Sequence, residues 1–116
     1  EFDKCSKKIF QTKSSLYNFS NVIPSEYALF QNYPNPFNPS TNIRYQVPFY
    51  EYITIDIINI RGQTIKNLVQ RLHPPGNYEI MWNGTDNYGL SVSSGIYFYR
   101  MNAPSFQSVH KLVKIK

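Results

Sequence analysis

The sequence has little of what disulfide-linked, metal-binding or membrane-spanning proteins need. Only one of its 116 residues is a cysteine, Cys5. One cysteine can form no internal disulfide and cannot build a cysteine-rich metal site. No apolar run approaches the roughly 18 residues of a transmembrane helix, so we expect no transmembrane segment. The chain opens without a basic and then apolar signal peptide, and we expect an exported parent to carry that peptide upstream.

Acidic residues and histidines are scarce as well, with seven of the first and two of the second. General acid–base catalysis needs a positioned pair of titratable groups. His73 precedes a Pro-Pro-Gly turn and His110 lies near lysines, and neither has an acidic neighbour or the spacing of a metal-binding pair. Cys5 lacks a neighbouring base that could activate it. We therefore predict no catalytic residue, no cofactor and no enzymatic activity.

The chain carries an excess of basic residues, with a formal net charge of +5. Lys111, Lys114 and Lys116 stand close to the C-terminus with no acid among them. Most aromatic residues fit core positions rather than exposed stacking platforms, so we predict no nucleic-acid partner. The terminal lysines can attract an anionic partner or protect a sheet edge from pairing, and charge alone leaves both interpretations open.

Aromatic residues are abundant, with ten tyrosines and eight phenylalanines, and such residues favour strands. Alternation of apolar and polar residues predicts strands over 27–31, 41–48, 52–60, 76–83, 96–101 and 106–115. The range 63–72 fits both a helix and a strand, and we prefer a kinked strand because its neighbours are strands. These elements predict an all-β, immunoglobulin-like antiparallel β-sandwich of about seven strands.

The alternation also predicts which side chains face the core. One face of each strand collects the apolar side chains of Ile43, Tyr45 and Val47, of Ile53, Ile55 and Ile57, and of Tyr78, Ile80 and Trp82. The run 96–101 differs because it is apolar on both faces, and we expect both of its faces to be covered.

A proline-rich segment, residues 32–40, separates the first two predicted strands. Its three prolines exclude a helix and a central strand. Asn35 and Asn38 can form side-chain-capped turns. We expect a stiff crossing loop in which Tyr33 and Phe37 anchor to the core.

The composition changes near residue 26. Residues 1–26 are rich in Lys, Ser, Asn and Gln and show no lasting period. We expect this segment to be a linker from an upstream domain, disordered in part or ending in an edge strand. Residues 27–116 form the predicted domain.

The loop of residues 83–89 contains the chain's one calcium candidate. Asn83, Asp86 and Asn87 could each supply a side-chain oxygen. Calcium sites use six to eight oxygen ligands, usually with more carboxylates than this loop offers. We prefer a hairpin capped by these side chains.

Several sequence blocks occur in a fixed order along residues 27–116. They are Phe30-Gln31-Asn32-Tyr33-Pro34-Asn35-Pro36-Phe37-Asn38-Pro39-Ser40-Thr41, Ile60-Arg61-Gly62-Gln63 followed by Leu68-Val69, Pro75-Gly76-Asn77-Tyr78, Trp82-Asn83-Gly84-Thr85-Asp86-Asn87-Tyr88-Gly89, Ser94-Gly95-Ile96-Tyr97-Phe98-Tyr99-Arg100 and Lys111-Leu112-Val113-Lys114-Ile115-Lys116. In this order they resemble the type A C-terminal sorting domain of the type IX (Por) secretion system of Bacteroidetes. That family is similar in fold to the Ig-like domain of the flagellar hook-capping protein.

The resemblance implies a non-catalytic sorting signal that follows a cargo domain in cis. Its partners would be an outer-membrane translocon, a shuttle protein and a sortase-like peptidase, and the cargo would pass through the periplasm to the cell surface or medium. The residues that the resemblance assigns to partner recognition are Gly95, Tyr97, Tyr99, Arg100, Lys111, Leu112, Val113, Lys114, Ile115 and Lys116.

The last strand supports this expectation physically, because it can offer an open backbone edge and a basic rim to a partner. The same residues could instead only close the core and keep the edge soluble. Two other functions remain open at this point, namely a carbohydrate- or matrix-binding accessory module of a secreted enzyme, and a structural spacer.

Overall fold

Seven strands and no helix make up the part of the chain that the structure, a computed structural model, describes, residues 23–116. The predicted linker therefore lies outside the described residues up to residue 22. The strands are β2 (Ala28–Leu29), β3 (Thr41–Val47), β4 (Glu51–Ile58), β5 (Thr64–His73), β6 (Gly76–Trp82), β7 (Gly95–Ala103) and β8 (Phe106–Lys114).

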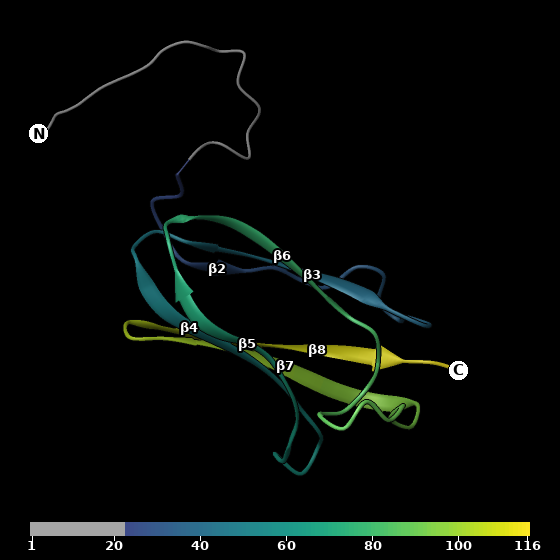
Figure 1. Ribbon diagram of the computed structural model, residues 1–116. Helices are drawn as coiled ribbons and strands as arrows, with labels where there is room; N and C mark the ends of the chain where they lie inside the picture. Colours follow the sequence, from purple (N-terminus) through teal and green to yellow (C-terminus); the bar gives the residue numbers. More distant parts are fainter. Residues whose placement is uncertain (1–22) are drawn as a thin grey trace, which may run out of the picture.

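The strands form two antiparallel sheets that pack face to face (Figure 1). One sheet has the order β2-β3-β6 and the other the order β5-β4-β7-β8. The chain crosses between the sheets after β3, after β5 and after β6, as the layers of Figure 1 show. The prediction of an all-β Ig-like sandwich is confirmed.

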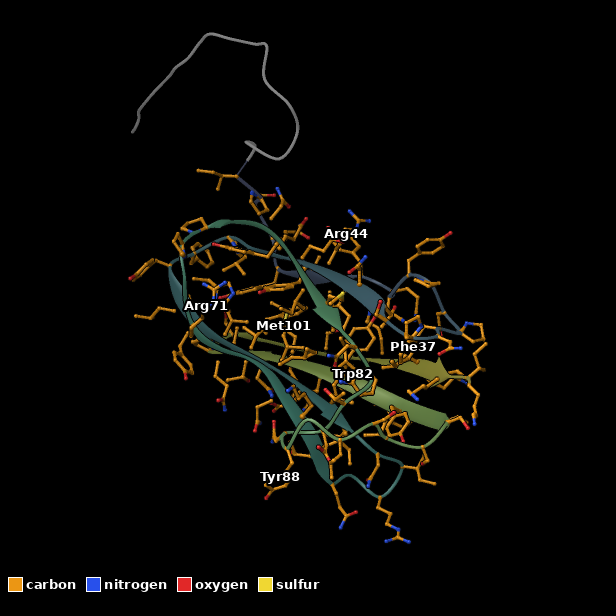
Figure 2. The ribbon with its side chains drawn as sticks, turned by 45° about the vertical axis from the view of Figure 1, so that its right-hand side comes forward. Phe37, Arg44, Arg71, Trp82, Tyr88 and Met101 are labelled. Atoms are coloured by element: carbon orange, nitrogen blue, oxygen red, sulfur yellow. The ribbon has the colours of Figure 1, made fainter. Side chains whose placement is uncertain are left out.

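The core lies between the two sheets and contains the residues that the alternation predicts. The fully buried side chains include those of Ile43, Val47, Ile53, Ile55, Ile57 and Trp82. Each such side chain stabilises the fold by about 1.5–3 kcal/mol relative to an exposed one. Phe37 and Trp82 meet in this core with their ring centroids 5.4 Å apart (Figure 2).

The ambiguous range 63–72 forms a strand, β5, with two irregularities in its pairing with β4. Ile55 pairs with Val69 and Asp56 with Asn67, so Leu68 is an extra residue. The second irregularity follows Ile57, which pairs with Lys66. Ile58 then pairs with Thr64, so Ile65 is also an extra residue. Bulges of this kind interrupt the two-residue period of a strand. The two bulges explain why the apolar residues of this segment have helical spacing. The prediction of a kinked strand is correct.

Two expectations about the core are wrong. Phe37 is 1% exposed and anchors the proline-rich loop, but Tyr33 is 79% exposed and does not. The side chain of Tyr33 lies on the outside because Tyr33 pairs with Asn42, an outward-facing residue of β3, and paired residues share a face. β7 is also not covered on both faces, since Ile96 is 45% exposed. In a two-layer sandwich, only one face of β7 can meet the other sheet.

Candidate functional site

The proline-rich loop pairs with the end of β8. The Phe37 N–H donates to the Val113 carbonyl at 2.9 Å, and the Ile115 N–H donates to the Phe37 carbonyl at 2.9 Å. These bonds form a short parallel bridge between Phe37 and Lys114. The Val113 N–H also donates to Asn35 Oδ1 at 3.0 Å. The loop therefore acts as an additional partner for the outer edge of β8.

This arrangement corrects the expectation that the last strand offers an open backbone edge. The loop occupies the edge from Val113 to Ile115, and Gln31 Nε2 donates to the Lys111 carbonyl at 2.9 Å. Among residues 23–116, no strand pairs with the outer edge of β8 from Phe106 to His110. Strand addition by a partner could therefore use only the first half of β8.

The loop between β6 and β7 also contacts the end of β8, through the side chain of Lys114. Lys114 Nζ donates to the Val92 carbonyl at 3.0 Å, and its side chain passes over Gly84. A Cβ atom on Gly84 would lie 2.7 Å from Lys114 Cε, and the φ of Gly84 is +78°. Gly84 is thus required both for its backbone conformation and for the space it leaves. Of the terminal lysines, Lys111 and Lys116 are exposed and Lys114 is half-buried.

The calcium candidate residues each bond to other parts of the protein. Asp86 Oδ1 accepts the N–H groups of Tyr88 at 2.9 Å and Leu90 at 3.0 Å. Asn83 Oδ1 accepts the Thr85 hydroxyl at 2.6 Å, while the Asn87 side chain pairs with Asn67 on β5. These bonds are those of the preferred side-chain-capped hairpin. In the described part of the chain, no three His, Cys, Asp or Glu side chains are placed to hold a metal.

The two histidines have structural contacts. His73 is fully buried, and its Nδ1–H donates to the Arg71 carbonyl at 3.0 Å, so its Nε2 accepts the Tyr45 hydroxyl at 2.7 Å. Burial lowers the pKa of His73, and the Arg71 charge lowers it further. His110 Nε2 bonds to the Leu29 carbonyl at 2.7 Å, which makes it a donor. Cys5 lies outside the described residues.

Two of the sequence blocks, the proline-rich loop and the loop that contains Gly84, thus contact the end of β8, and comparison with known families identifies the chain. A family model for the secretion system C-terminal sorting domain matches residues 31–116. The chain belongs to this family. A search of curated proteins found no match. No helix within residues 23–116 is long and apolar enough to cross a membrane.

Two solved structures share the fold of this sorting domain. Dimeric latent PorU from Porphyromonas gingivalis has 20% identity and a TM-score of 0.63, over 82% of this chain and 10% of that chain. PorZ from the same organism, an essential bacterial surface component of the type IX secretion system, has 17% identity and a TM-score of 0.53. That match covers 84% of this chain and 12% of PorZ. The sorting domain therefore spans about a tenth of the length of either protein.

Several residues that the resemblance assigns to recognition are in the core of the sorting domain. Tyr97, Tyr99 and Leu112 are buried. The Tyr97 hydroxyl donates to the Ser93 carbonyl at 2.6 Å, and the Tyr99 hydroxyl donates to the Phe30 carbonyl at 2.6 Å. Burial raises the pKa of Tyr99 to about 12, so it stays a neutral donor. While the domain is folded, these three residues can support recognition only by holding β7 and β8 in place.

The outward-facing residues of β7 include one predicted residue, Arg100, and two that sequence reasoning missed. Arg100 Nη2 lies 3.9 Å from Asp56 Oδ2, and Arg100 Nε is buried without a hydrogen-bond partner. Ile96 and Phe98 alternate with buried residues and therefore lie on the same outer face. Strict two-residue alternation from Gly95 was the signal that could have found them. Gly95 itself is exposed at the start of β7.

Proposed function

We propose that this chain is the non-catalytic C-terminal signal that directs an upstream cargo domain through the type IX secretion system to the cell surface or medium. The observation that carries this proposal is the sorting-domain family match over residues 31–116. Residues 27–116 form the signal, and residues 1–26 link it to the cargo.

The end of β8 is suited to recognition because two loops hold it in one conformation. A segment that is ordered before binding loses less conformational entropy when a partner binds it. Lys111 and Lys116 are exposed and can attract a partner's carboxylates, whereas Lys114 is held by the Val92 carbonyl. The recognition site would comprise Gly95, Arg100 and residues 111–116, with Tyr97, Tyr99 and Leu112 supporting it from the core.

The partners in this proposal are the outer-membrane translocon, the shuttle protein and the sortase-like peptidase of the type IX system. The shuttle and translocon would meet the domain after it reaches the periplasm, and the peptidase would cut near the linker. Family membership supports this function over a carbohydrate-binding module, which no comparison favours.

A fusion experiment tests the proposal. The full 116-residue chain is attached to the C-terminus of a reporter with a signal peptide, and the fusion is expressed in cells with a working type IX system. We expect the reporter at the cell surface or in the medium, and the same reporter without the chain in the periplasm. Retention of the fusion in the periplasm would contradict the proposed function.

A further inference from the structure

One outer face of the domain is more apolar than a solvent-facing sheet surface requires. The side chains that face outward from β7 and β8 are Ile96, Phe98, Arg100, Val109, Lys111 and Val113, a set that we name the β7–β8 outer face. Ile96 and Val109 are 45% and 48% exposed. Within residues 23–116, no further layer lies beyond this sheet on the side away from β2, β3 and β6 (Figure 1). Exposed apolar side chains gathered with charged ones on such a face are typical of a protein-binding site.

The register of the strands brings these side chains together. Ile96 pairs with Val113, Phe98 with Lys111 and Arg100 with Val109. On the other side of β7, Phe98 pairs with Ile58 of β4, which is buried and adds little exposed area. Further along the strands, Asn102 accepts a hydrogen bond from Gln107 at 2.8 Å, and this polar pair ends the patch. The β7–β8 outer face therefore consists of neighbouring apolar side chains with Arg100 and Lys111 between them.

A groove continues the patch past the start of β7. It has a volume of about 660 Å³ and lies between the turn at Asn59–Arg61 and the segment 92–97. Ile60, Ile65, Val92 and Ile96 line it, and Ile96 also belongs to the β7–β8 outer face. A partner that covers the face could place an apolar side chain in this groove.

The charges of the face indicate what kind of partner fits. Arg100 lies 3.9 Å from Asp56 Oδ2, so these two charges offset each other, whereas Lys111 stands opposite Phe98 and leaves the face with one more cation than acids. A partner with carboxylates around an apolar centre would complement both the charge and the apolar surface. The opposite outer face, on β3 and β6, is different because Arg44 and Glu79 pair across it and balance each other.

We propose that the β7–β8 outer face, with the adjoining groove, is the surface by which the secretion machinery binds this domain, and that the partner is a protein surface with apolar side chains flanked by carboxylates. This inference rests on the proposed function. It moves the main contact from the edge of β8, whose end the proline-rich loop covers, to the outer face of the sheet beside it.

Charge substitutions on the face test the inference in the reporter fusion. The double variant Ile96→Glu/Val109→Glu places carboxylates where the partner presents its own, and we expect export to fall about tenfold. Ile96→Lys/Val109→Lys removes the same apolar contacts without repelling an acidic partner, and we expect a smaller loss. The matched control is Met81→Glu/Leu72→Glu, which changes two similarly exposed apolar residues outside the face and should leave export within about twofold.

The outcomes separate the inference from the proposed function. Thermal unfolding of each purified variant shows whether it is folded, and Val109→Glu alone replaces the double variant if that one unfolds. Export of a folded Glu variant at the unmodified level would overturn the β7–β8 outer face as the binding surface. Equal losses for the Glu and Lys variants would overturn the acidic character of the partner. Failure of the unmodified fusion to be exported would instead contradict the proposed function.

Discussion

At the scale of single residues, Gly84 and Lys114 hold the end of β8 in place. Both residues stand out in the sequence for other properties. Gly84 belongs to a turn-forming block, yet its lack of a side chain also leaves room for Lys114. Lys114 belongs to the basic tail, yet its ammonium group bonds to the Val92 carbonyl. Both residues thus hold the terminal strand in place, and neither role follows from composition or charge.

Replacing Gly84 with alanine should destabilise the domain more than the same change at Gly89. Both glycines have positive φ, +78° and +83°, which costs an alanine about 1–3 kcal/mol. Only at Gly84 does the new Cβ meet Lys114, which would have to leave the Val92 carbonyl. We expect an additional loss of about 1 kcal/mol in the free energy of unfolding, measured by urea denaturation. Equal losses for the two variants would show that the Lys114 contact contributes nothing.

At the scale of elements, loops cover part of both edges of the larger sheet. The proline-rich loop covers the end of β8. On β5, the Asn87 N–H donates to the Ile65 carbonyl at 3.2 Å, while the Asn67 N–H donates to Asn87 Oδ1 at 3.0 Å. Exposed edge strands invite pairing with other chains, and covering loops prevent it. The faces of the sheet and the first half of the β8 edge are thereby left for partners.

Asn35→Ala should loosen the end of β8 locally. The substitution removes the acceptor of the Val113 N–H, while Phe37 and its own bonds to the strand remain. We expect the opening free energy of the Val113 amide, measured by hydrogen exchange, to fall by about 1 kcal/mol. The opening free energy of the Ile115 amide should fall less. The control Asn38→Ala changes an exposed asparagine of the same loop and should leave both amides as they are. Similar exchange in the two variants would contradict the role of Asn35.

At the scale of the whole molecule, the two sheets enclose one ionisable group whose protonation opposes folding. His73 ends β5, and its ring contacts Tyr45 on β3 and Tyr78 on β6, so it lies where the two sheets meet. Nδ1–H donates to the Arg71 carbonyl, and Nε2 accepts the Tyr45 hydroxyl. A proton on Nε2 would replace that acceptor with a donor inside the core and beside the charge of Arg71.

The stability of the domain should therefore fall as the pH drops below about 6.5. The unfolded chain binds a proton at His73 near the ordinary pKa of 6.5, whereas burial lowers the pKa of the folded state. Between these two values the unfolded state holds more protons, so stability rises with pH by at most about 1.4 kcal/mol per unit. Urea denaturation from pH 5 to pH 8 measures the slope. His73→Gln should reduce this slope, and an unchanged slope in His73→Gln would contradict the assignment.

Much of the fold could be predicted from the sequence, and the candidate site only in part. Alternation correctly predicted the core face of β3, β4 and β6, because the two-residue period of a strand is a local property. In β5 the bulged residues Ile65 and Leu68 concealed that period. The sequence blocks correctly indicated the family but did not separate buried Tyr97 and Tyr99 from outward-facing Ile96 and Phe98.

The sequence by itself determined the all-β class, the alternating core and the family, since each depends on residues that are near one another in the chain. Only the tertiary structure decided that the end of the β8 edge is covered, that Phe37 rather than Tyr33 is the anchor, and that the outer face of β7 is uncovered. The bond between Val113 and Asn35 joins residues 78 positions apart. Contacts of this range depend on which loop crosses which edge, and no local pattern encodes that choice.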